Sequence, residues 1–244
     1  MLPIPDSATV TTPEVSVIVP LFNEEGSIAQ LQRELETALK EISYELLFVD
    51  DGSSDRTIER IRRAPGVRIL EFEKNTGQSA AMYAGLAAGN GKILVLIDGD
   101  LQNDPNDIPR LLAEVDQGAD LVCGFRLKRR DTWFKRVQSR IANGVRSRFT
   151  GDGVRDTGCT LKAMRRECRE ALIPFHGMHR FIPALIKGLG YKITEIPVNH
   201  RPRQHGASKY NFGNRALRAT IDMFGVRWFL DRQIKFAIKK TKEI

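Results

Sequence analysis

Cysteine is scarce in this 244-residue sequence, and it forms no recognisable pattern. The three cysteines, Cys123, Cys159 and Cys168, are odd in number and scattered, and they include no C-x-x-C pair. A disulfide framework or a structural zinc site needs paired or regularly spaced cysteines. The sequence therefore predicts neither, and we expect three reduced thiols.

Long apolar runs are also missing. No stretch approaches the roughly 18 apolar residues that suggest a membrane-spanning helix. Residues 1–13 lack the basic and apolar regions of a signal peptide. We therefore expect a cytoplasmic protein with a flexible N-terminus over residues 1–13.

Two common phosphate-binding motifs are absent as well. The sequence has no G-x-x-x-x-G-K-[ST], and no G-x-G-x-x-G follows its first predicted strand. A P-loop and a dinucleotide-binding fingerprint are therefore excluded. Any nucleotide must be held in another way.

Positive charge is plentiful and unevenly spread. The formal net charge is +8, and residues 126–148 and 201–242 are rich in Arg and Lys, whereas the acidic motifs lie in the first 120 residues. Such a balance indicates an anionic partner: nucleic acid, a phosphorylated substrate or an acidic membrane surface. No basic-and-aromatic motif supports nucleic acid, so we expect no nucleic-acid partner.

The hydrophobic pattern predicts alternating strands and helices. Residues 28–42 carry apolar side chains at helical spacing behind Ser27, and Gln30 completes a capping-box pattern. Asp104 and Pro105 read as the cap and first position of another helix. Short apolar runs predict strands at 15–19, 45–49, 67–72, 93–97 and 119–124. The expected fold is α/β, with a mostly parallel central sheet flanked by helices.

Polar loops follow four of these predicted strands. They read PLFNEEGS, DDGSSDRT, EKNTGQS and DGDLQNDP, and parallel strands bring such loops to one sheet edge. Asp98 and Asp100, two residues apart, can converge on one hard cation while Gln102 adds a carbonyl oxygen, which suits Mg²⁺ or Mn²⁺. Helix caps and turns are the structural alternative for these residues.

Several motifs together carry a family resemblance. VSVIVPLFNEE, LLFVDDGSSDRT, NTGQSAAMYAGLAAG and LVLIDGDLQNDP occur in this order, followed by ADLVCGFR, DTGCTLKAMRRE and RPRQHGASKY. The sequence thereby resembles family 2 glycosyltransferases with the GT-A (Rossmann-like) fold, in the branch of dolichol-phosphate mannosyltransferase and the polyprenyl-phosphate glycosyltransferases. The resemblance covers residues 14–212, which we expect to form the glycosyltransferase domain.

The resemblance implies roles for the loop residues. Asp98, Asp100 and Gln102 would bind the metal and the diphosphate-sugar of a nucleotide-sugar donor. Asp51 is the expected partner of the base, although the motif does not separate it from Asp50. The nucleoside pocket would be lined by Pro20, Phe22, Glu24 and Asp51.

The acceptor site is expected in the basic half. Residues 133–149 have apolar side chains every four residues, which predicts an amphipathic helix. The resemblance maps the arginine pair that grips a lipid phosphate onto Arg126 and Arg140, and Arg suits phosphate because its planar fork binds two oxygens. A phosphate acceptor is already anionic near neutral pH, so attack on the sugar would need no general base and would invert its anomeric configuration.

A basic loop and a C-terminal segment complete the expectations. Arg203 and Lys209, in RQHGASKY, would reach the diphosphate if that loop folds over the site. Residues 213–244 are predicted to form amphipathic helices. From residue 230 an apolar face of Leu230, Ile234, Ala237 and Ile238 opposes Arg232, Lys235 and Lys239, with Phe224, Trp228 and Phe229 upstream. This pattern fits peripheral contact with the anionic inner face of the cytoplasmic membrane, or packing on the domain or in a homo-oligomer.

Two other functions are compatible with parts of the sequence. A transferase of the same fold can act on a non-lipid sugar acceptor, and would then require a general base. A non-enzymatic, receiver-like signalling domain would use VDDGSSD as an acidic pocket, but it leaves DGDLQNDP and RQHGASKY without a role. The expected function is therefore inverting transfer of a sugar from a GDP- or UDP-sugar to a polyprenyl phosphate such as dolichyl or undecaprenyl phosphate.

Overall fold

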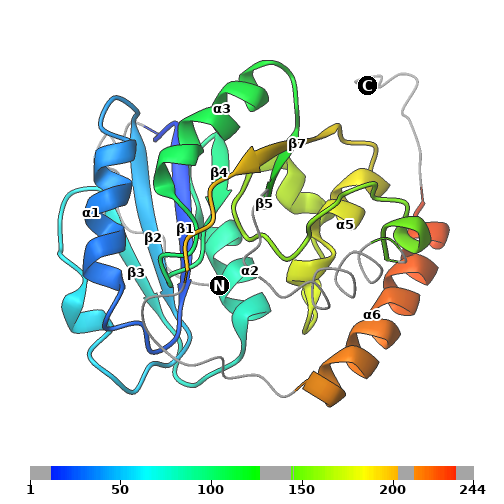
Figure 1. Cartoon of the computed structure of the whole chain (residues 1–244), viewed down its shortest axis with the longest axis horizontal. Coiled ribbons are helices and arrows are strands. Elements are labelled where there is room, and N and C mark those ends of the chain that lie inside the picture. Colours follow the sequence, from blue (N-terminus) through cyan, green and yellow to red (C-terminus); the bar gives the residue numbers. More distant parts are fainter. Residues whose placement is uncertain (1–11, 127–143, 145, 203–211, 235–244) are drawn as a thin grey trace, which may run out of the picture.

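The computed structural model describes residues 12–126, 144, 146–202 and 212–234. Their central element is a seven-stranded sheet in the order β3-β2-β1-β4-β6-β5-β7 (Figure 1). The strands are β1 (Val15–Leu21), β2 (Tyr44–Asp50), β3 (Val67–Glu71), β4 (Ile93–Leu96), β5 (Leu121–Arg126), β6 (Lys162–Arg165) and β7 (Ile193–Val198). The five strands that the sequence predicts are confirmed as β1 to β5.

Strand direction brings the loops of interest together. The pairs β1–β2, β2–β3, β1–β4 and β5–β7 are parallel, whereas β6 runs antiparallel to both β4 and β5. All strands except β6 therefore point the same way, and their carboxyl ends share one edge of the sheet. The predicted mostly parallel α/β fold is confirmed.

Helices cover both faces of the sheet (Figure 1). One face packs against α1 (Ile28–Ala38) and α3 (Ile108–Asp116), and the other against α2 (Gln78–Ala88), α5 (Ile182–Gly188) and part of α6 (Phe212–Arg232). Neighbouring strand residues serve opposite layers, as with Phe48 and Leu47, both fully buried. Each such side chain stabilises the fold by about 1.5–3 kcal/mol relative to exposure, which explains the continuous apolar runs.

The starts of two helices differ in how well the sequence predicts them. Asp104 accepts a hydrogen bond from the Asn106 backbone N–H and caps a 3₁₀ turn leading into α3, so that cap is confirmed. The capping box at Ser27 is wrong: its hydroxyl donates to the backbone oxygen and carboxylate of Glu24, and Gln30 donates to Glu34. Glu24 thus competes successfully for the hydroxyl that the pattern assigns to the helix.

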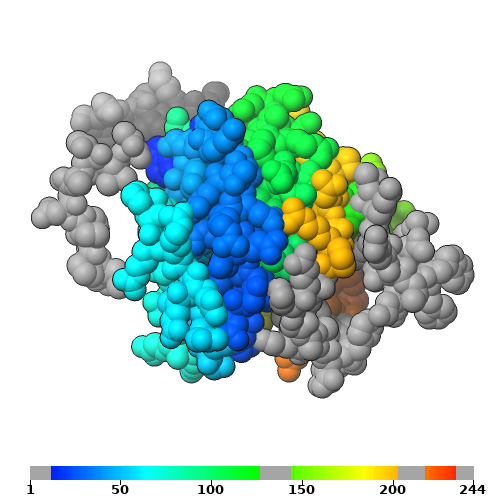
Figure 2. All heavy atoms as spheres, turned by 60° about the vertical axis from the view of Figure 1, so that its left-hand side comes forward, coloured from blue at the N-terminus to red at the C-terminus, as the bar shows by residue number. Residues whose placement is uncertain are grey.

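The segment after β7 crosses back to the first half of the chain. Figure 2 shows it, in orange-yellow, against α1 in blue and α3 in green. The Arg201 guanidinium lies 2.6 Å from the Glu34 carboxylate on α1 and 2.9 Å from that of Asp104. The Asn199 backbone N–H donates to Asp107 over 2.6 Å. These contacts hold the end of β7 beside the loop that follows β4.

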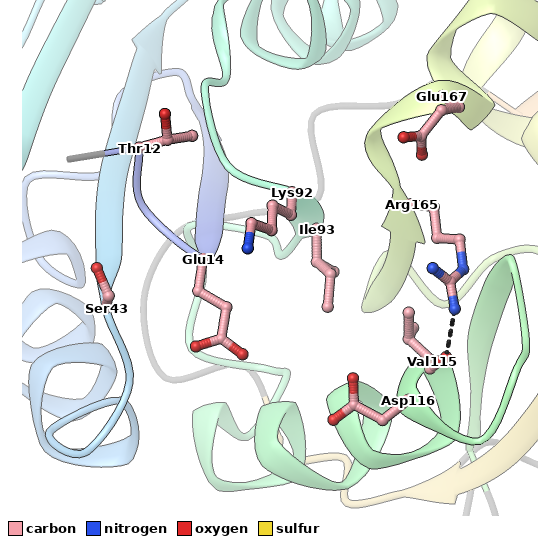
Figure 3. Close-up of a pocket in the computed structure, with 9 residues that line it drawn as sticks. All are labelled: Thr12, Glu14, Ser43, Lys92, Ile93, Val115, Asp116, Arg165 and Glu167. Atoms are coloured by element: carbon pink, nitrogen blue, oxygen red, sulfur yellow. Dashed lines mark hydrogen bonds between the residues drawn. The ribbon is translucent and has the colours of Figure 1, made fainter. Parts of the chain in front are cut away.

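A hollow of about 460 Å³ opens at the opposite edge of the sheet. Glu14 precedes β1, Lys92 precedes β4, and Arg165 ends the antiparallel β6, so all three mark the amino-terminal edge. Figure 3 shows their side chains around it, with Arg165 donating to the backbone oxygen of Val115. The hollow is therefore distinct from the polar loops at the carboxyl edge.

Candidate active site

The predicted metal-binding residues lie in the loop that follows β4. The side chain of Gln78, the first residue of α2, donates to Oδ1 of Asp98 over 3.0 Å, and Thr160 also hydrogen-bonds Asp98. Oδ1 of Asp100 accepts from the Gln102 backbone N–H over 3.1 Å. Asp98 is half-buried and Asp100 is 8% exposed. The loop thus presents two ordered carboxylates within two residues.

Buried neighbours impose the shape of this loop. Leu101 has a φ of 62°, a left-handed conformation that is rare for a bulky residue, and its side chain is 1% exposed within the core. A Cβ added to Gly99 would lie 2.6 Å from a methyl carbon of Leu21. Core packing of Leu101 and the close approach at Gly99 therefore hold Asp98 and Asp100 in a conformation that the loop would not adopt alone.

The electrostatics of the loop favour a cation. Burial and the neighbouring Asp100 carboxylate raise the pKa of Asp98 to about 6, against the opposing effects of the Thr160 hydrogen bond and the Lys162 charge. Lys162 is 2% exposed, and its ammonium donates to the backbone oxygen of Cys159. Two crowded carboxylates, of which Asp98 has a raised pKa, have the oxygen chemistry that hard divalent cations prefer.

Asp51 organises the loop that follows β3. Its carboxylate accepts backbone N–H groups of Thr76 over 2.6 Å and Gly77 over 2.8 Å, and the side-chain amide of Asn75 over 2.9 Å. The side chain is 3% exposed. A carboxylate that accepts several N–H bonds in a buried site rigidifies the backbone around it. The structure therefore gives Asp51 protein partners, and its predicted contact with a base stays a prediction.

Asp50 differs from its neighbour. One oxygen, Oδ2, accepts the Ser53 backbone N–H over 2.9 Å, while the buried Oδ1 has no hydrogen-bond partner among the described residues. Gly52, in the turn between Asp50 and Ser53, has a φ of 72°. A Cβ added to it would lie 2.8 Å from the Asn75 backbone nitrogen. Only glycine fits this turn. Asp50 is thus a buried carboxylate with an unused acceptor.

Reciprocal hydrogen bonds join the loops after β1 and β2. The Asn23 backbone N–H donates to the Ser53 hydroxyl and its side chain accepts the Ser54 N–H, both over 2.8 Å. The Glu24 N–H donates to the Thr57 hydroxyl over 2.8 Å. These bonds fix the backbone that carries three predicted nucleoside residues: Pro20, buried in β1, and Phe22 and Glu24, both half-buried.

The segment that follows β7 is attached to the loop after β4. The Arg201 backbone N–H donates to the backbone oxygen of Gln102 over 2.8 Å, and Asn103 forms an isolated antiparallel bridge with His200. The backbone of Gln102 is therefore fixed by the segment after β7, about 100 residues away in the sequence. Arg203 and Lys209, which follow this attachment, lie outside the described residues.

The first predicted acceptor residue ends β5. The guanidinium of Arg126 makes two parallel hydrogen bonds to Asp156, from Nε over 2.7 Å and from Nη2 over 2.8 Å. Only 15% of the Arg126 side chain and 10% of the Asp156 side chain are exposed. Arg140 and most of the predicted helix 133–149 lie outside the described residues. Arg126 thus reaches the carboxyl edge, where the predicted donor residues gather.

Comparison with known proteins assigns the chain to a family. Residues 16–172 match the family model described as glycosyl transferase family 2. The chain belongs to this family. It is 41% identical over 203 residues to an undecaprenyl-phosphate 4-deoxy-4-formamido-L-arabinose transferase of Edwardsiella ictaluri, covering 80% of this chain and 62% of the relative. It is 39% identical over 230 residues to a dodecaprenyl-phosphate galacturonate synthase of Rhizobium johnstonii, covering 89% and 67%.

Solved structures agree on the fold of this family 2 chain. A glucosyl-3-phosphoglycerate synthase from Mycobacterium tuberculosis, in complex with Mn²⁺, UDP and phosphoglyceric acid, superposes with a TM-score of 0.69. The identity is 21%, covering 91% of this chain and 80% of that one. The same enzyme with Mg²⁺ and UDP gives a TM-score of 0.68 at 23% identity. The GT-A fold is therefore confirmed, whereas the chain spans only 62–67% of the two curated relatives' lengths.

Sequence reasoning missed the residues that hold this family 2 site in place. Gln78 and Thr160 bind Asp98, the Asn75–Gly77 segment binds Asp51, and Asp156 binds Arg126. Asp156 and Thr160 do fall in the quoted motif DTGCT, and Gln78 falls in NTGQS. The signal available in the sequence was that these polar residues lie inside recognised motifs but had no assigned role.

Proposed function

We propose that this protein transfers a sugar from a nucleoside-diphosphate sugar to a polyprenyl phosphate. One structural observation carries the proposal: a single turn joins the two halves of the site, because Thr160 hydrogen-bonds Asp98 while Asp156 pairs with Arg126. An acidic pair suited to a cation and an arginine suited to a phosphate are therefore neighbours. The polyprenyl-phosphate acceptors named for the curated relatives support the same reaction.

The donor's diphosphate would be bound through a divalent cation. Asp98, Asp100 and Gln102 fit Mg²⁺ or Mn²⁺, because the two carboxylates are crowded and burial raises the pKa of Asp98. When bound, the metal would offset the negative charge that develops on the leaving diphosphate. Gln78 and Thr160 orient Asp98 for this task by hydrogen bonds.

The nucleoside would lie over the joined loops after β1 and β2. Pro20, Phe22 and Glu24 would form one wall of this pocket. The unused Oδ1 of Asp50 supports a contact between this residue and a donor group of the base, whereas Asp51 would shape the pocket through the loop at Thr76 and Gly77. Arg203 and Lys209 would add positive charge for the diphosphate, from the segment after Arg201.

The acceptor phosphate would be held by Arg126 together with Arg140. A phosphate monoester is already ionised near neutral pH, so one of its oxygens can attack the anomeric carbon without a base to remove a proton. The residues would then act by aligning the two reactants, and one direct displacement inverts the anomeric configuration. A sugar hydroxyl acceptor would instead require a positioned general base.

Peripheral membrane contact would bring the lipid acceptor to this site. Among the described residues, no helix is both long and apolar enough to cross a bilayer. Helix α6 exposes Ile221, Phe224 and Trp228, each about 60% accessible and spaced to lie on one face. Leu230 and Phe229 pack toward the core, which is the alternative of packing on the domain that the sequence left open. The outward stripe of Ile221, Phe224 and Trp228 is therefore our candidate membrane contact.

The reaction is tested by offering labelled GDP- and UDP-sugars with Mg²⁺ or Mn²⁺ and a short polyprenyl phosphate, followed by mass spectrometry of the lipid. We expect one donor to give a lipid-monophosphate sugar, and no product when the metal is chelated. The matched polyprenol, which lacks the phosphate, is the control and should remain unmodified. Donor turnover without a lipid product, or equal use of the polyprenol, would contradict the proposed acceptor.

A further inference from the structure

We infer that Lys162 is a buried counter-charge that weakens the binding of a free divalent cation to the Asp98–Asp100 pair, so that the cation binds together with the donor's diphosphate. The inference rests on the metal site of the proposed function and deepens it, because it concerns how that site distinguishes a free cation from one that accompanies a nucleotide. Its evidence lies in the burial of Lys162, the partners of its ammonium group and its place in the sheet.

Lys162 carries its charge into the interior of the protein. Its side chain is 2% exposed and belongs to β6, which lies between β4 and β5 in the sheet. Lysine is almost never fully buried without a partner, because removing an ammonium group from water is costly. Apolar side chains such as those of Ala163 and Met164, its neighbours on β6, carry no such cost. The charge of Lys162 therefore needs a compensating negative charge nearby.

Within the described part of the chain, the ammonium group of Lys162 has a backbone partner but no ion pair. It donates to the backbone oxygen of Cys159, which is neutral. Its charge acts to lower the pKa of Asp98 and of two thiols, Cys123 and Cys159. At both thiols burial has the larger effect and raises the pKa, that of Cys123 to about 12, so both stay neutral. Asp98 is therefore the anion among these three groups.

The register of the sheet places Lys162 behind the acidic loop. Lys162 pairs with Leu96, the last residue of β4. The same register, continued by two residues, sets Thr160 opposite Asp98, and these two side chains are hydrogen-bonded. Residues two apart in a strand point to the same face, so Lys162 and Thr160 project to the face that carries Asp98. The lysine therefore approaches the carboxylate pair from the interior of the sheet.

A fixed positive charge beside two carboxylates affects a free cation and a cation with a diphosphate differently. It repels a free divalent cation and lowers its affinity, because charges in a partly buried site interact more strongly than in water. A donor adds a diphosphate, whose negative charge the same ammonium group attracts. When both ligands bind, attraction and repulsion offset each other. Lys162 therefore favours joint binding of cation and nucleotide, which is a coupling between the two ligands.

The test measures the Mn²⁺ affinity of the metal-free protein at about pH 8, where Asp98 is ionised, from the electron paramagnetic resonance of free Mn²⁺. Lys162→Met removes the charge and keeps a flexible apolar side chain. We expect this variant to bind Mn²⁺ about 10-fold more tightly than wild type, because one nearby positive charge is lost. With UDP or GDP present, the gain should shrink to less than about 3-fold, because the lost attraction to the diphosphate offsets it.

Two further variants separate the charge of Lys162 from its hydrogen bond. Lys162→Gln also removes the charge but keeps an N–H donor for the backbone oxygen of Cys159, and it should bind Mn²⁺ as tightly as Lys162→Met. Wild-type affinity in Lys162→Gln, beside tighter binding in Lys162→Met, would assign the effect to the hydrogen bond and overturn the inference. Lys187→Met is the matched control: Lys187 also donates to a backbone oxygen, that of Asp152 over 3.1 Å, but from α5. It should leave the Mn²⁺ affinity unchanged.

The remaining outcomes distinguish this inference from the proposed function, because the binding test contains no lipid acceptor. Tighter Mn²⁺ binding in both Lys162 variants, without sugar transfer to a polyprenyl phosphate by wild type, would support the counter-charge and contradict the proposed reaction. Unchanged or weaker Mn²⁺ binding in both variants would overturn the counter-charge alone. A gain in affinity equally large with and without nucleotide would overturn the coupling. No Mn²⁺ binding to any form, with or without nucleotide, would overturn the metal site and the inference together.

Discussion

The proposed donor and acceptor sides of the site hold their carboxylates in opposite ways. On the donor side, Asp51 is surrounded by neutral N–H donors, and Asp98 and Asp100 stand together in partial burial. On the acceptor side, Asp156 is matched by the guanidinium of Arg126. The donor side therefore has an excess of negative charge, which a cation would balance. On the proposed acceptor side, an arginine within the protein balances the carboxylate of Asp156.

The largest effect should come from removing one carboxylate of the Asp98–Asp100 pair on the proposed donor side. Asp100→Ala should reduce transfer at least about 1000-fold, because the cation loses a ligand and the leaving diphosphate loses its compensating charge. Thermal unfolding without metal should stay close to that of wild type, since removal of the Asp100 carboxylate also removes its repulsion of the Asp98 carboxylate. Transfer is measured at saturating metal and donor. Wild-type turnover in this variant would remove Asp100 from the metal site.

The next largest effect concerns the hydrogen bonds that neutral N–H groups donate to the Asp51 carboxylate. Asp51→Ala should lower the free energy of unfolding by about 2–4 kcal/mol, because two backbone N–H groups and an amide lose a buried charged acceptor. Denaturant unfolding measures this change. Asp55→Ala is the control: Asp55 also accepts loop hydrogen bonds, but it is far more exposed and should cost less. Equal costs would show that burial does not set the importance of Asp51.

A smaller effect is expected at the surface beyond the acceptor side. Replacing Ile221 and Trp228 together by Ser should weaken sedimentation with anionic liposomes about 10-fold, because two exposed apolar side chains no longer enter the interface. Leu189→Ser is the control, since Leu189 is 45% exposed but lies outside α6. Undiminished sedimentation together with a lower molecular mass would instead identify the stripe as a contact between copies of this chain.

The smallest effect concerns the ionisation of Asp98 and its cost to the stability of the metal-free protein. The folded-state pKa of Asp98, about 6, is above its ordinary 3.8, so its ionisation opposes folding above pH 6 and has no effect below about pH 4. Asp98→Asn should therefore stabilise the metal-free protein at pH 7.5 by about 1 kcal/mol, or roughly 2–4 °C, and not at pH 4. Mg²⁺ should then stabilise wild type but not the variant. A variant less stable than wild type at pH 7.5 would contradict the raised pKa.

Local patterns predicted the elements better than the partners of polar side chains. The strands β1 to β5 and the cap at Asp104 were recognisable because apolar periodicity and capping depend on residues close in sequence. The capping box at Ser27 failed because the preceding loop turns Glu24 toward its hydroxyl. For the face of α6 that holds Leu230 the sequence left membrane contact and packing on the domain open, since helical spacing identifies an apolar face but not what covers it; the structure packs Leu230 on the domain.

The sequence by itself determined the α/β alternation, the acidic loop after β4 and membership of the family, because motifs in order along the chain carry that information. Only the tertiary structure decided that Asp51 binds the loop after β3, that the backbone of Gln102 is fixed by Arg201, and that Asp156 holds Arg126. These partners are 25 to about 100 residues apart. They meet because six strands end at one edge of the sheet, a closeness that no local pattern encodes.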